Sequence, residues 1–370
     1  MLLNRYKFRL FTTVVPSDSS AHFSKATSNN SKQINDAEQT LATTPMLSVV
    51  KSPIKAPSND PHDYVTLSTY AWPNPNTPNG LPYILRDGRT NPETDKYPAR
   101  KHLELLIKSV RLLVSGYTAS HDERYANRAI ELIDGWFLKP ETRMNPNLNY
   151  AQICPGKNNG MGNPSGVIET HNFVDLIEQI TKLEKAYTVS PQFKWGIRQW
   201  FKEYLNWLQT STNGRKAAEF KNNQLTWYTA QMVAIAEFTG NAKIAQDILV
   251  SFIYNLLPNQ INAEGGQPEE LQRSKSFNYS LVNLQALFKL AALGQNIGVD
   301  LWHYQLRNNA GLEKALDFLI PYATGQKTWP YQEIQPYDPS LMKSVVNMAI
   351  KAYPEKRSVY ESALSNLKVF

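Results

Sequence analysis

The sequence predicts an all-α protein, an (α/α) toroid in which helical hairpins form an incomplete barrel and long loops form a cleft at one end. Apolar residues recur at helical spacing over most of the chain from Lys101 onward, and no segment pair alternates convincingly as strands. The helices share no fixed repeat length, and their connections are long and unequal, which disfavours a regular solenoid. A ring of hairpins would bury alternating helix faces and gather the loops at one end.

The first hairpin is predicted from two apolar patterns. Leu103 to Tyr117 and Tyr125 to Trp136 both follow the i, i+3, i+4, i+7 rule, with a break expected at Ser115-Gly116. Asp338 and Pro339 are typical of a helix start, because Asp caps and Pro fits the first helical position. Further helices are predicted at residues 167–188, 192–211, 226–239, 242–256, 279–296, 311–321, 338–352 and 356–368.

Composition limits the kinds of site that this chain can build. Its 370 residues hold a single cysteine, Cys154, so neither an intramolecular disulfide nor a cysteine zinc site can form. The six histidines show no HxxxH or HxH spacing. We therefore expect no metal site and no cofactor.

The first 60 residues differ from the rest. Residues 1–15 carry Arg5, Lys7 and Arg9 without an acid and resemble a short export signal, and residues 16–60 are rich in Ser, Thr, Asn, Lys and Pro. We predict a disordered or targeting-type leader at 1–60, a toroid domain at 61–370, and a secreted or periplasmic location. No apolar run approaches the roughly 18 residues of a membrane span.

The net charge of +7 favours an acidic partner. Lys and Arg are dispersed along the helices, and no nucleic-acid-binding signature is present, so an acidic polysaccharide fits better than nucleic acid. The 8 Trp and 19 Tyr are consistent with stacking on sugar rings, although most aromatic residues in any protein are core. The sequence does not predict an oligomeric state.

Three short segments carry the side chains that can act on a sugar carboxylate. Asn222, Asn223 and Gln224 supply amides, Arg273 a guanidinium and Tyr279 a phenol. Amides and a guanidinium can neutralise a carboxylate, and a phenol can move a proton beside it. We predict Asn223, Gln224, Arg273 and Tyr279 as catalytic residues.

Two non-helical loops and nearby residues are expected to contact substrate. Residues 62–88 are rich in Pro, Asn and aromatics and predict a cleft wall with Tyr70 and Trp72, or a strap over the helices. Residues 143–152 are dense in Asn and end at Gln152, although turn formation alone explains many of these residues. The predicted substrate-binding residues are Asn222, His171, Gln152, Tyr70, Trp72 and Tyr228.

These segments together resemble the alginate lyase-type domain family, polysaccharide lyases with helical toroid folds. The family carries H-D-Y, Y-W-P-D-P, W-F-L-x-P-x-T-R-M-N-P-N-L, N-N-H-G-T-W-Y-D, and Q-P-x-E-L-x-R-T followed by a Tyr. The chain has close counterparts at residues 62–64, 70–75, 136–148, 222–229, and 267–274 with Tyr279. The resemblance covers about residues 60–330.

The resemblance implies β-elimination on a polyuronate such as alginate or glucuronan. The C5 proton of a uronate is removed, the 4-O-glycosidic bond breaks, and an unsaturated sugar remains. Asn223, Gln224 and Arg273 would neutralise the carboxylate. Tyr279 would carry the proton, with a pKa lowered by the neighbouring arginine.

The chain also departs from the family pattern. Gln224 replaces the family's histidine, Leu225 its glycine and Thr229 its aspartate. Because glutamine cannot accept a proton near neutral pH, Tyr279 must act as both base and acid, or catalysis is lost. The alternatives are a toroid that binds an acidic polysaccharide without cleaving it, and a glycoside hydrolase, which needs two opposed carboxylic acids.

Overall fold

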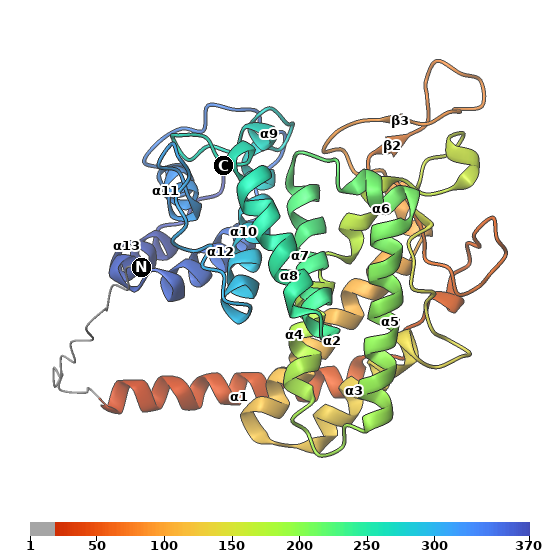
Figure 1. Ribbon diagram of the computed structural model, residues 1–370, viewed down its shortest axis with the longest axis horizontal. Coiled ribbons are helices and arrows are strands. Elements are labelled where there is room, and N and C mark those ends of the chain that lie inside the picture. The colour runs from red at the N-terminus through yellow and green to blue at the C-terminus, as the bar shows by residue number, and fades with distance from the viewer. Residues whose placement is uncertain (1–18) are drawn as a thin grey trace, which may run out of the picture.

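The computed structural model describes residues 19–370, with side chains from residue 29, and it is predominantly helical (Figure 1). The segment predicted as an export signal, residues 1–15, lies outside the described residues. The helices are α1 (Ser19–Thr43), α2 (Ala99–Ser120), α3 (Glu123–Phe137), α4 (Phe173–Leu183), α5 (Pro191–Thr210), α6 (Thr212–Ala217), α7 (Asn223–Phe238), α8 (Ala242–Asn255), α9 (Pro268–Leu271), α10 (Ser276–Asn296), α11 (Leu312–Ala323), α12 (Pro339–Ala352) and α13 (Arg357–Ser365).

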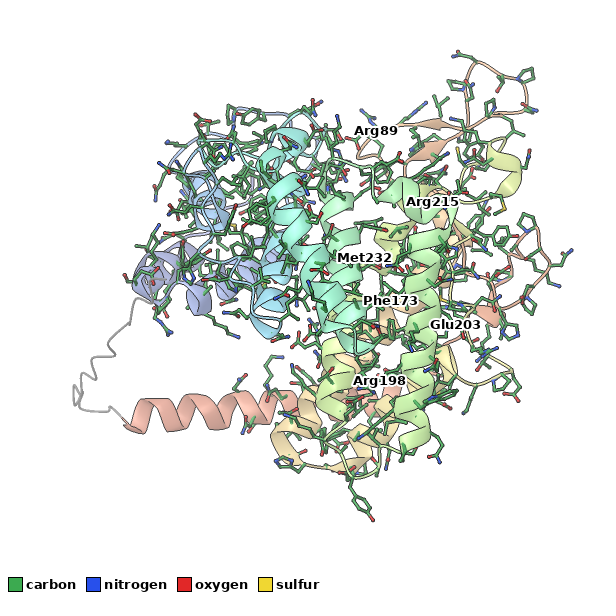
Figure 2. The ribbon with its side chains drawn as sticks, viewed as in Figure 1. Arg89, Phe173, Arg198, Glu203, Arg215 and Met232 are labelled. Carbon is green, nitrogen blue, oxygen red and sulfur yellow. The ribbon has the colours of Figure 1, made fainter. Side chains whose placement is uncertain are left out.

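The helices form the predicted incomplete toroid. Helices α2, α4, α7, α10 and α12 contact one another in that order, while α3 packs on α2, and α5 and α8 pack on α7. Helices α7 and α10 are buried on nearly all sides, as expected for inner helices. Phe173 of α4 and Met232 of α7 lie in this core (Figure 2).

The prediction of disorder in the leader is wrong from residue 29 onward, because this part of the chain is folded. The C-terminal half of α1 packs on α2, with Ala37 fully buried, and Leu47 and Val49 join the core. Glu38 also accepts hydrogen bonds from Arg124 and Tyr125 at the start of α3. The polar composition of α1 hides this docking, since a few buried side chains hold the helix in place.

The predicted break at Ser115-Gly116 is also wrong. Helix α2 continues through both residues and ends at Ser120, followed by the C-cap residue His121, whose φ of 57° is left-handed. A Cβ atom on Gly116 would lie 2.3 Å from the Cβ of Ala37. Gly116 therefore allows α1 to approach α2 closely and does not stop the helix.

Four short strands correct the prediction that no strand pair forms. Strand β1 (Val65–Leu67) pairs in parallel with β4 (Tyr150–Ile153), and β2 (Ala71–Trp72) pairs antiparallel with β3 (Ile84–Leu85). The β1–β4 pair joins the two predicted loops to each other, and the β2–β3 pair lies within the first of them. The β2–β3 hairpin lies at the end of the molecule that also carries α6 and α9 (Figure 1).

Candidate active site

A hydrogen-bonded network of charged and polar side chains joins the first turns of α7 and α10 to α9. Asn222 caps α7, since its side-chain oxygen accepts a hydrogen bond from the backbone N–H of Gln224 at 3.1 Å. The next residue, Asn223, donates both its backbone N–H and its Nδ2 to Oε1 of Glu270 in α9. The predicted Asn223 is thereby fixed by a carboxylate that the sequence did not assign to it.

Glu270 is the buried centre of this network. Its side chain is 1% exposed, and its second oxygen, Oε2, pairs with Arg273 Nη1 at 3.3 Å. Burial raises the pKa of Glu270, while Arg273 and Asn223 oppose that shift. Glu270 therefore holds α9 against the start of α7.

Arg273 is shared between two carboxylates and one aromatic ring. Its Nη2 donates to Asp87 Oδ1 at 2.8 Å, and its guanidinium carbon lies 3.6 Å from the centroid of the Tyr279 ring. Asp87 also accepts from the backbone and hydroxyl of Ser274. Burial opposes ionisation of Asp87, but the contacts with Arg273 and Ser274 outweigh it and lower the pKa of Asp87.

Tyr279 lies in the first turn of α10 with 7% of its surface exposed. Its hydroxyl donates to the Tyr70 hydroxyl at 2.8 Å, and Tyr70 is held by a backbone bond from Arg86 beside β3. Burial, and then Tyr70, raise the pKa of Tyr279 far above its ordinary value, and Arg273 only partly opposes them. The net shift is therefore upward and not downward as predicted, because burial and Tyr70 outweigh the lowering by Arg273, which stacks on the ring.

The structure thus brings together Asn222, Asn223, Arg273, Tyr279 and Tyr70. Gln224 follows directly, and its Oε1 is buried without a hydrogen-bond partner among the described residues. An orphaned buried acceptor costs about 1–3 kcal/mol, so a donor from a bound sugar would be a favourable partner. Leu225 lines an adjoining pocket of about 660 Å³.

The other predicted contacts have partners inside the protein. Trp72 donates to the backbone oxygen of Arg89 at 2.9 Å, with Arg86 over its ring, at the end where Figure 2 labels Arg89. The Tyr228 hydroxyl donates to the Leu208 carbonyl, and burial raises its pKa to about 12. Both side chains are therefore fixed before any ligand binds.

Gln152 joins β4 to the segment that precedes α4. Its backbone N–H donates to Thr66 at 2.7 Å, and its side-chain oxygen accepts from Ser165 at 3.0 Å. Its φ of 55° is unusual for a residue other than glycine. Both the backbone and the side chain of Gln152 are therefore bonded to other parts of the protein.

His171 packs edge-on against Trp227, with ring centroids 4.8 Å apart, one helical turn beyond Gln224. Its Nδ1 donates to the Ile168 carbonyl at 2.7 Å. Burial lowers the pKa of His171, so the ring is neutral at neutral pH and its other nitrogen is an acceptor.

Sequence reasoning missed Lys275, which lies between Arg273 and Tyr279. Its side chain makes no hydrogen bond or ion pair within the described residues, although Lys275 is only 6% exposed. Burial lowers the pKa of Lys275, and Glu333 and Asp87 oppose that shift. Its position inside the Arg273–Tyr279 interval is the signal that could have identified it.

The structure gives no support for opposed hydrolytic acids. Asp63 binds Ser58 and Asn145, Asp87 binds Arg273, and Glu169 binds Thr66. Each carboxylate thus belongs to a hydrogen-bonding group of its own. Within the described part of the chain, no three His, Cys, Asp or Glu side chains are grouped as metal ligands, and no helix is long and apolar enough to cross a membrane.

Comparison with known proteins agrees with this architecture. An alginate lyase from Bacteroides ovatus is 34% identical, over 92% of this chain and 89% of that chain, with a TM-score of 0.85. Alginate lyase A1-III from Sphingomonas species A1 is 15% identical over 84% and 79% of the two chains, with a TM-score of 0.51. A histidine-to-alanine variant of A1-III complexed with a tetrasaccharide is 14% identical over 84% and 78%, with a TM-score of 0.52.

The two A1-III comparisons show a shared fold alone, because their sequence identity is low. A search of curated proteins finds no match. The family model for alginate lyase, by contrast, matches residues 48–329. Together with the Bacteroides ovatus structure, this match shows that the chain belongs to the alginate lyase family.

Proposed function

We propose that this protein is a polysaccharide lyase that cleaves a uronic-acid polymer of the alginate or glucuronan type by β-elimination. The observation that carries the proposal is the placement of Tyr279. Its ring is fixed by Arg273, and its hydroxyl is hydrogen-bonded to the hydroxyl of Tyr70. A base removes the C5 proton. The electron pair of the former C5–H bond then forms the C4–C5 double bond as the C4–O bond breaks. The departing oxygen then takes up a proton.

Tyr279 is the proton carrier in this proposal. Because its pKa is raised, the phenol is protonated at neutral pH and can donate to the departing oxygen. To act first as a base it must become a phenolate, which a bound substrate or an alkaline medium would have to favour. With Gln224 in place of the family's histidine, Tyr279 performs both proton transfers.

Asn223, Gln224 and Arg273 are proposed to neutralise the uronate carboxylate. The side-chain Nε2 of Gln224 makes no hydrogen bond among the described residues and can donate to the carboxylate, whereas its buried Oε1 can only accept, for example from a sugar hydroxyl. Arg273 is already paired with Asp87 and Glu270, so it contributes positive potential and fixes Tyr279 at the same time. Its net effect on the carboxylate is reduced by those two acids.

The walls of the proposed cleft come from Tyr70, Trp72 and Asn222. We assign Gln152 and Tyr228 to the fold instead, because their polar atoms bind Thr66, Ser165 and Leu208.

Neutral His171 is the alternative proton acceptor, since it packs on α7 one turn from Gln224. A polymer substrate too large to enter a cell favours a secreted or periplasmic location.

The second candidate function is a toroid that binds the polymer without cleaving it. Two features favour it: Gln224 cannot take a proton, and the pKa of Tyr279 is raised. Incubation with alginate, polymannuronate, polyguluronate and glucuronan, followed by the far-ultraviolet absorbance of the unsaturated product, separates the two functions. A lyase raises the absorbance on at least one polymer. Retarded migration of a polymer in a gel without any absorbance change would instead identify a binder.

A further inference from the structure

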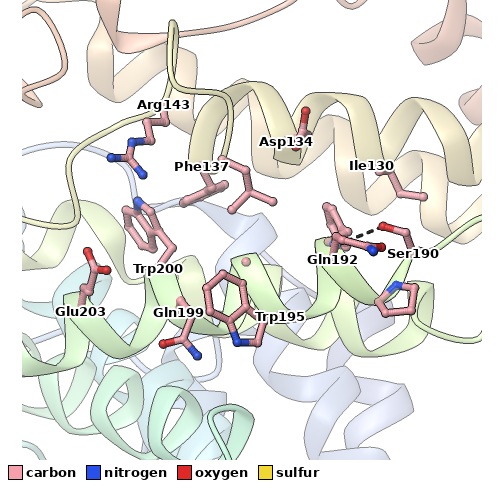
Figure 3. A pocket seen from close by; sticks show the side chains of 14 residues that line it. Ile130, Asp134, Phe137, Arg143, Ser190, Gln192, Trp195, Gln199, Trp200 and Glu203 are labelled. Carbon is pink, nitrogen blue, oxygen red and sulfur yellow. Dashed lines mark hydrogen bonds between the residues drawn. The ribbon is translucent and has the colours of Figure 1, made fainter.

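A groove of about 830 Å³ lies on the outer wall of the toroid, between α3 and the first half of α5 (Figure 3). Its volume is within the roughly 300–1,000 Å³ of small-molecule sites. Trp195 is 68% exposed there, whereas Phe137 and Trp200 at its base are core residues. The adjacent Gly196 has no side chain, so it leaves space for a ligand on the surface of α5 beside the indole.

The groove is separate from the proposed cleft. Trp195 lies near the start of α5, and the segment that leads to Asn222 begins at the other end of this helix. Thr210 lies 15 positions after Trp195, which corresponds to about 22 Å at the rise of an α-helix, and no residue proposed for the cleft lines the groove. A ligand in the groove therefore does not occupy the Tyr279 site.

The polar side chains along the groove are free to bind a ligand. Gln192, Gln199 and Glu203 share one face of α5 with Trp195, and Arg143 lies across from them (Figure 3). None of these four side chains has a hydrogen-bond or ion-pair partner among the residues that the structure describes. On another face of the same helix, Arg198 is paired with Glu184 and stacked on Phe238.

The charges in the groove disfavour a polyanion. Arg143 is its only cation among the lining residues, and Asp134 and Glu203 are both acids. An exposed indole instead complements the C–H face of a sugar ring. Two primary amides, from Gln192 and Gln199, can both donate to and accept from sugar hydroxyls.

We propose that this groove is a second carbohydrate site that binds an uncharged pyranose chain stacked on Trp195, with hydroxyls bonded to Gln192 and Gln199. The ligand differs in charge from the polyuronate proposed for the cleft. The site would hold the enzyme on a neutral polysaccharide that accompanies its substrate, and it requires no chemistry at Tyr279.

The test is calorimetric titration of the full chain with three uncharged probes: cellohexaose, laminarihexaose and mannohexaose. We expect at least one probe to bind, with little dependence on salt, and Trp195→Ala to weaken that binding about tenfold or more through loss of the stacking surface. Gln199→Ala should weaken it less. Tyr254→Ala is the matched control, because Tyr254 is an exposed aromatic residue, 66% accessible, on α8.

Binding in the groove and lyase activity in the cleft can be tested independently. Tyr279→Phe should bind the uncharged probe as the wild type does, and Trp195→Ala should retain lyase activity on short polyuronates. The proposal is overturned if none of the three probes binds. It is equally overturned if Trp195→Ala and Tyr254→Ala bind alike, or if added polyuronate competes for the site.

Discussion

Two buried polar networks in this molecule look alike in sequence but differ in access. The network around Glu270, Arg273 and Tyr279 lies at the starts of α7 and α10, and its Asp87 member is exposed. The network around Gln152 and Glu169 lies at the β1–β4 pair, and its members are closed off from solvent. Polar density alone therefore does not identify a site.

The difference lies in exposure to solvent and not in the number of unsatisfied atoms, because Oε1 of Glu169 in the closed network is also buried without a hydrogen-bond partner among the described residues. In the closed network, Thr66 binds both Gln152 and Glu169 and joins two chain segments. In the open network, Arg273 fixes the Tyr279 ring but leaves its hydroxyl bonded only to another tyrosine hydroxyl. Substitutions around Tyr279 should therefore change the rate of turnover, whereas substitutions around Gln152 should change the stability of the fold.

The largest effect is expected from Tyr279→Phe. Removing the hydroxyl deletes the proton carrier and keeps the ring that Arg273 stacks on, so kcat should fall about 100- to 10,000-fold. Polymer binding and thermal unfolding should change little. Near wild-type rates in the absorbance assay would show that Tyr279 does not carry the proton.

Arg273 should respond strongly to the shape of its replacement. Arg273→Ala leaves buried Glu270 without its cation, which costs about 3–5 kcal/mol of stability, and it should reduce both binding and turnover. Arg273→Lys should be milder, although a point charge cannot hold Asp87 and Glu270 as a planar fork does. Denaturant unfolding and initial rates at low salt measure both effects. Stability and initial rates close to the wild type in both variants would exclude a role for the guanidinium.

Gln152→Ala tests the closed network. The variant loses the side-chain bond to Ser165 and keeps the strained backbone, so we expect about 1–2 kcal/mol of lost stability with an unchanged KM. Gln152→Gly should recover part of this loss, because glycine tolerates a positive φ. A large rise in KM without loss of stability would instead place Gln152 in contact with substrate.

Tyr70→Phe tests the cause of the raised Tyr279 pKa. Tyr70 raises that pKa through charge and through its hydrogen bond, so removing its hydroxyl should lower the pKa of Tyr279. If the phenolate is the base, activity rises with pH, and this rise should move to lower pH in the variant. Rate profiles of wild type and variant over alkaline pH measure the shift; no shift, or one to higher pH, would refute the assignment.

The smallest effect is expected from Gln224→His. An imidazole with a pKa near ~6.5 adds a group that titrates near neutral pH, and the rate on at least one polyuronate should rise modestly. Leu225→Gly in the same molecule tests whether Leu225 restricts the ring. If the wild-type rate already changes with the titration of a group near neutral pH, and Gln224→His does not alter that change, His171 would be the next candidate for the base.

The sequence predicted most helices because apolar spacing is local information. It failed at α1, whose few buried contacts are hidden in a polar segment, and at Gly116, whose role depends on a helix some eighty residues away in the chain. The parallel pair β1–β4 escaped detection because its strands of three and four residues are too short to show alternation.

The same distinction applies to the site. The sequence predicts Tyr279 and Arg273 together as candidates, since they lie within one short segment. The partners that fix them, Asp87 and Tyr70, are distant in sequence, so only the fold could show them. The raised pKa of Tyr279 was missed for the same reason: it arises from burial and from Tyr70.

The most direct test of the central claim is digestion of a polyuronate in water enriched in oxygen-18, followed by mass spectrometry and far-ultraviolet absorbance. A lyase should release unsaturated oligosaccharides that absorb and carry no label from solvent, and Tyr279→Phe should release no such products. Saturated products with one labelled oxygen per cleavage would show hydrolysis. Binding of the polymer without any product would show that the cleft has lost its chemistry, and either result would contradict the account.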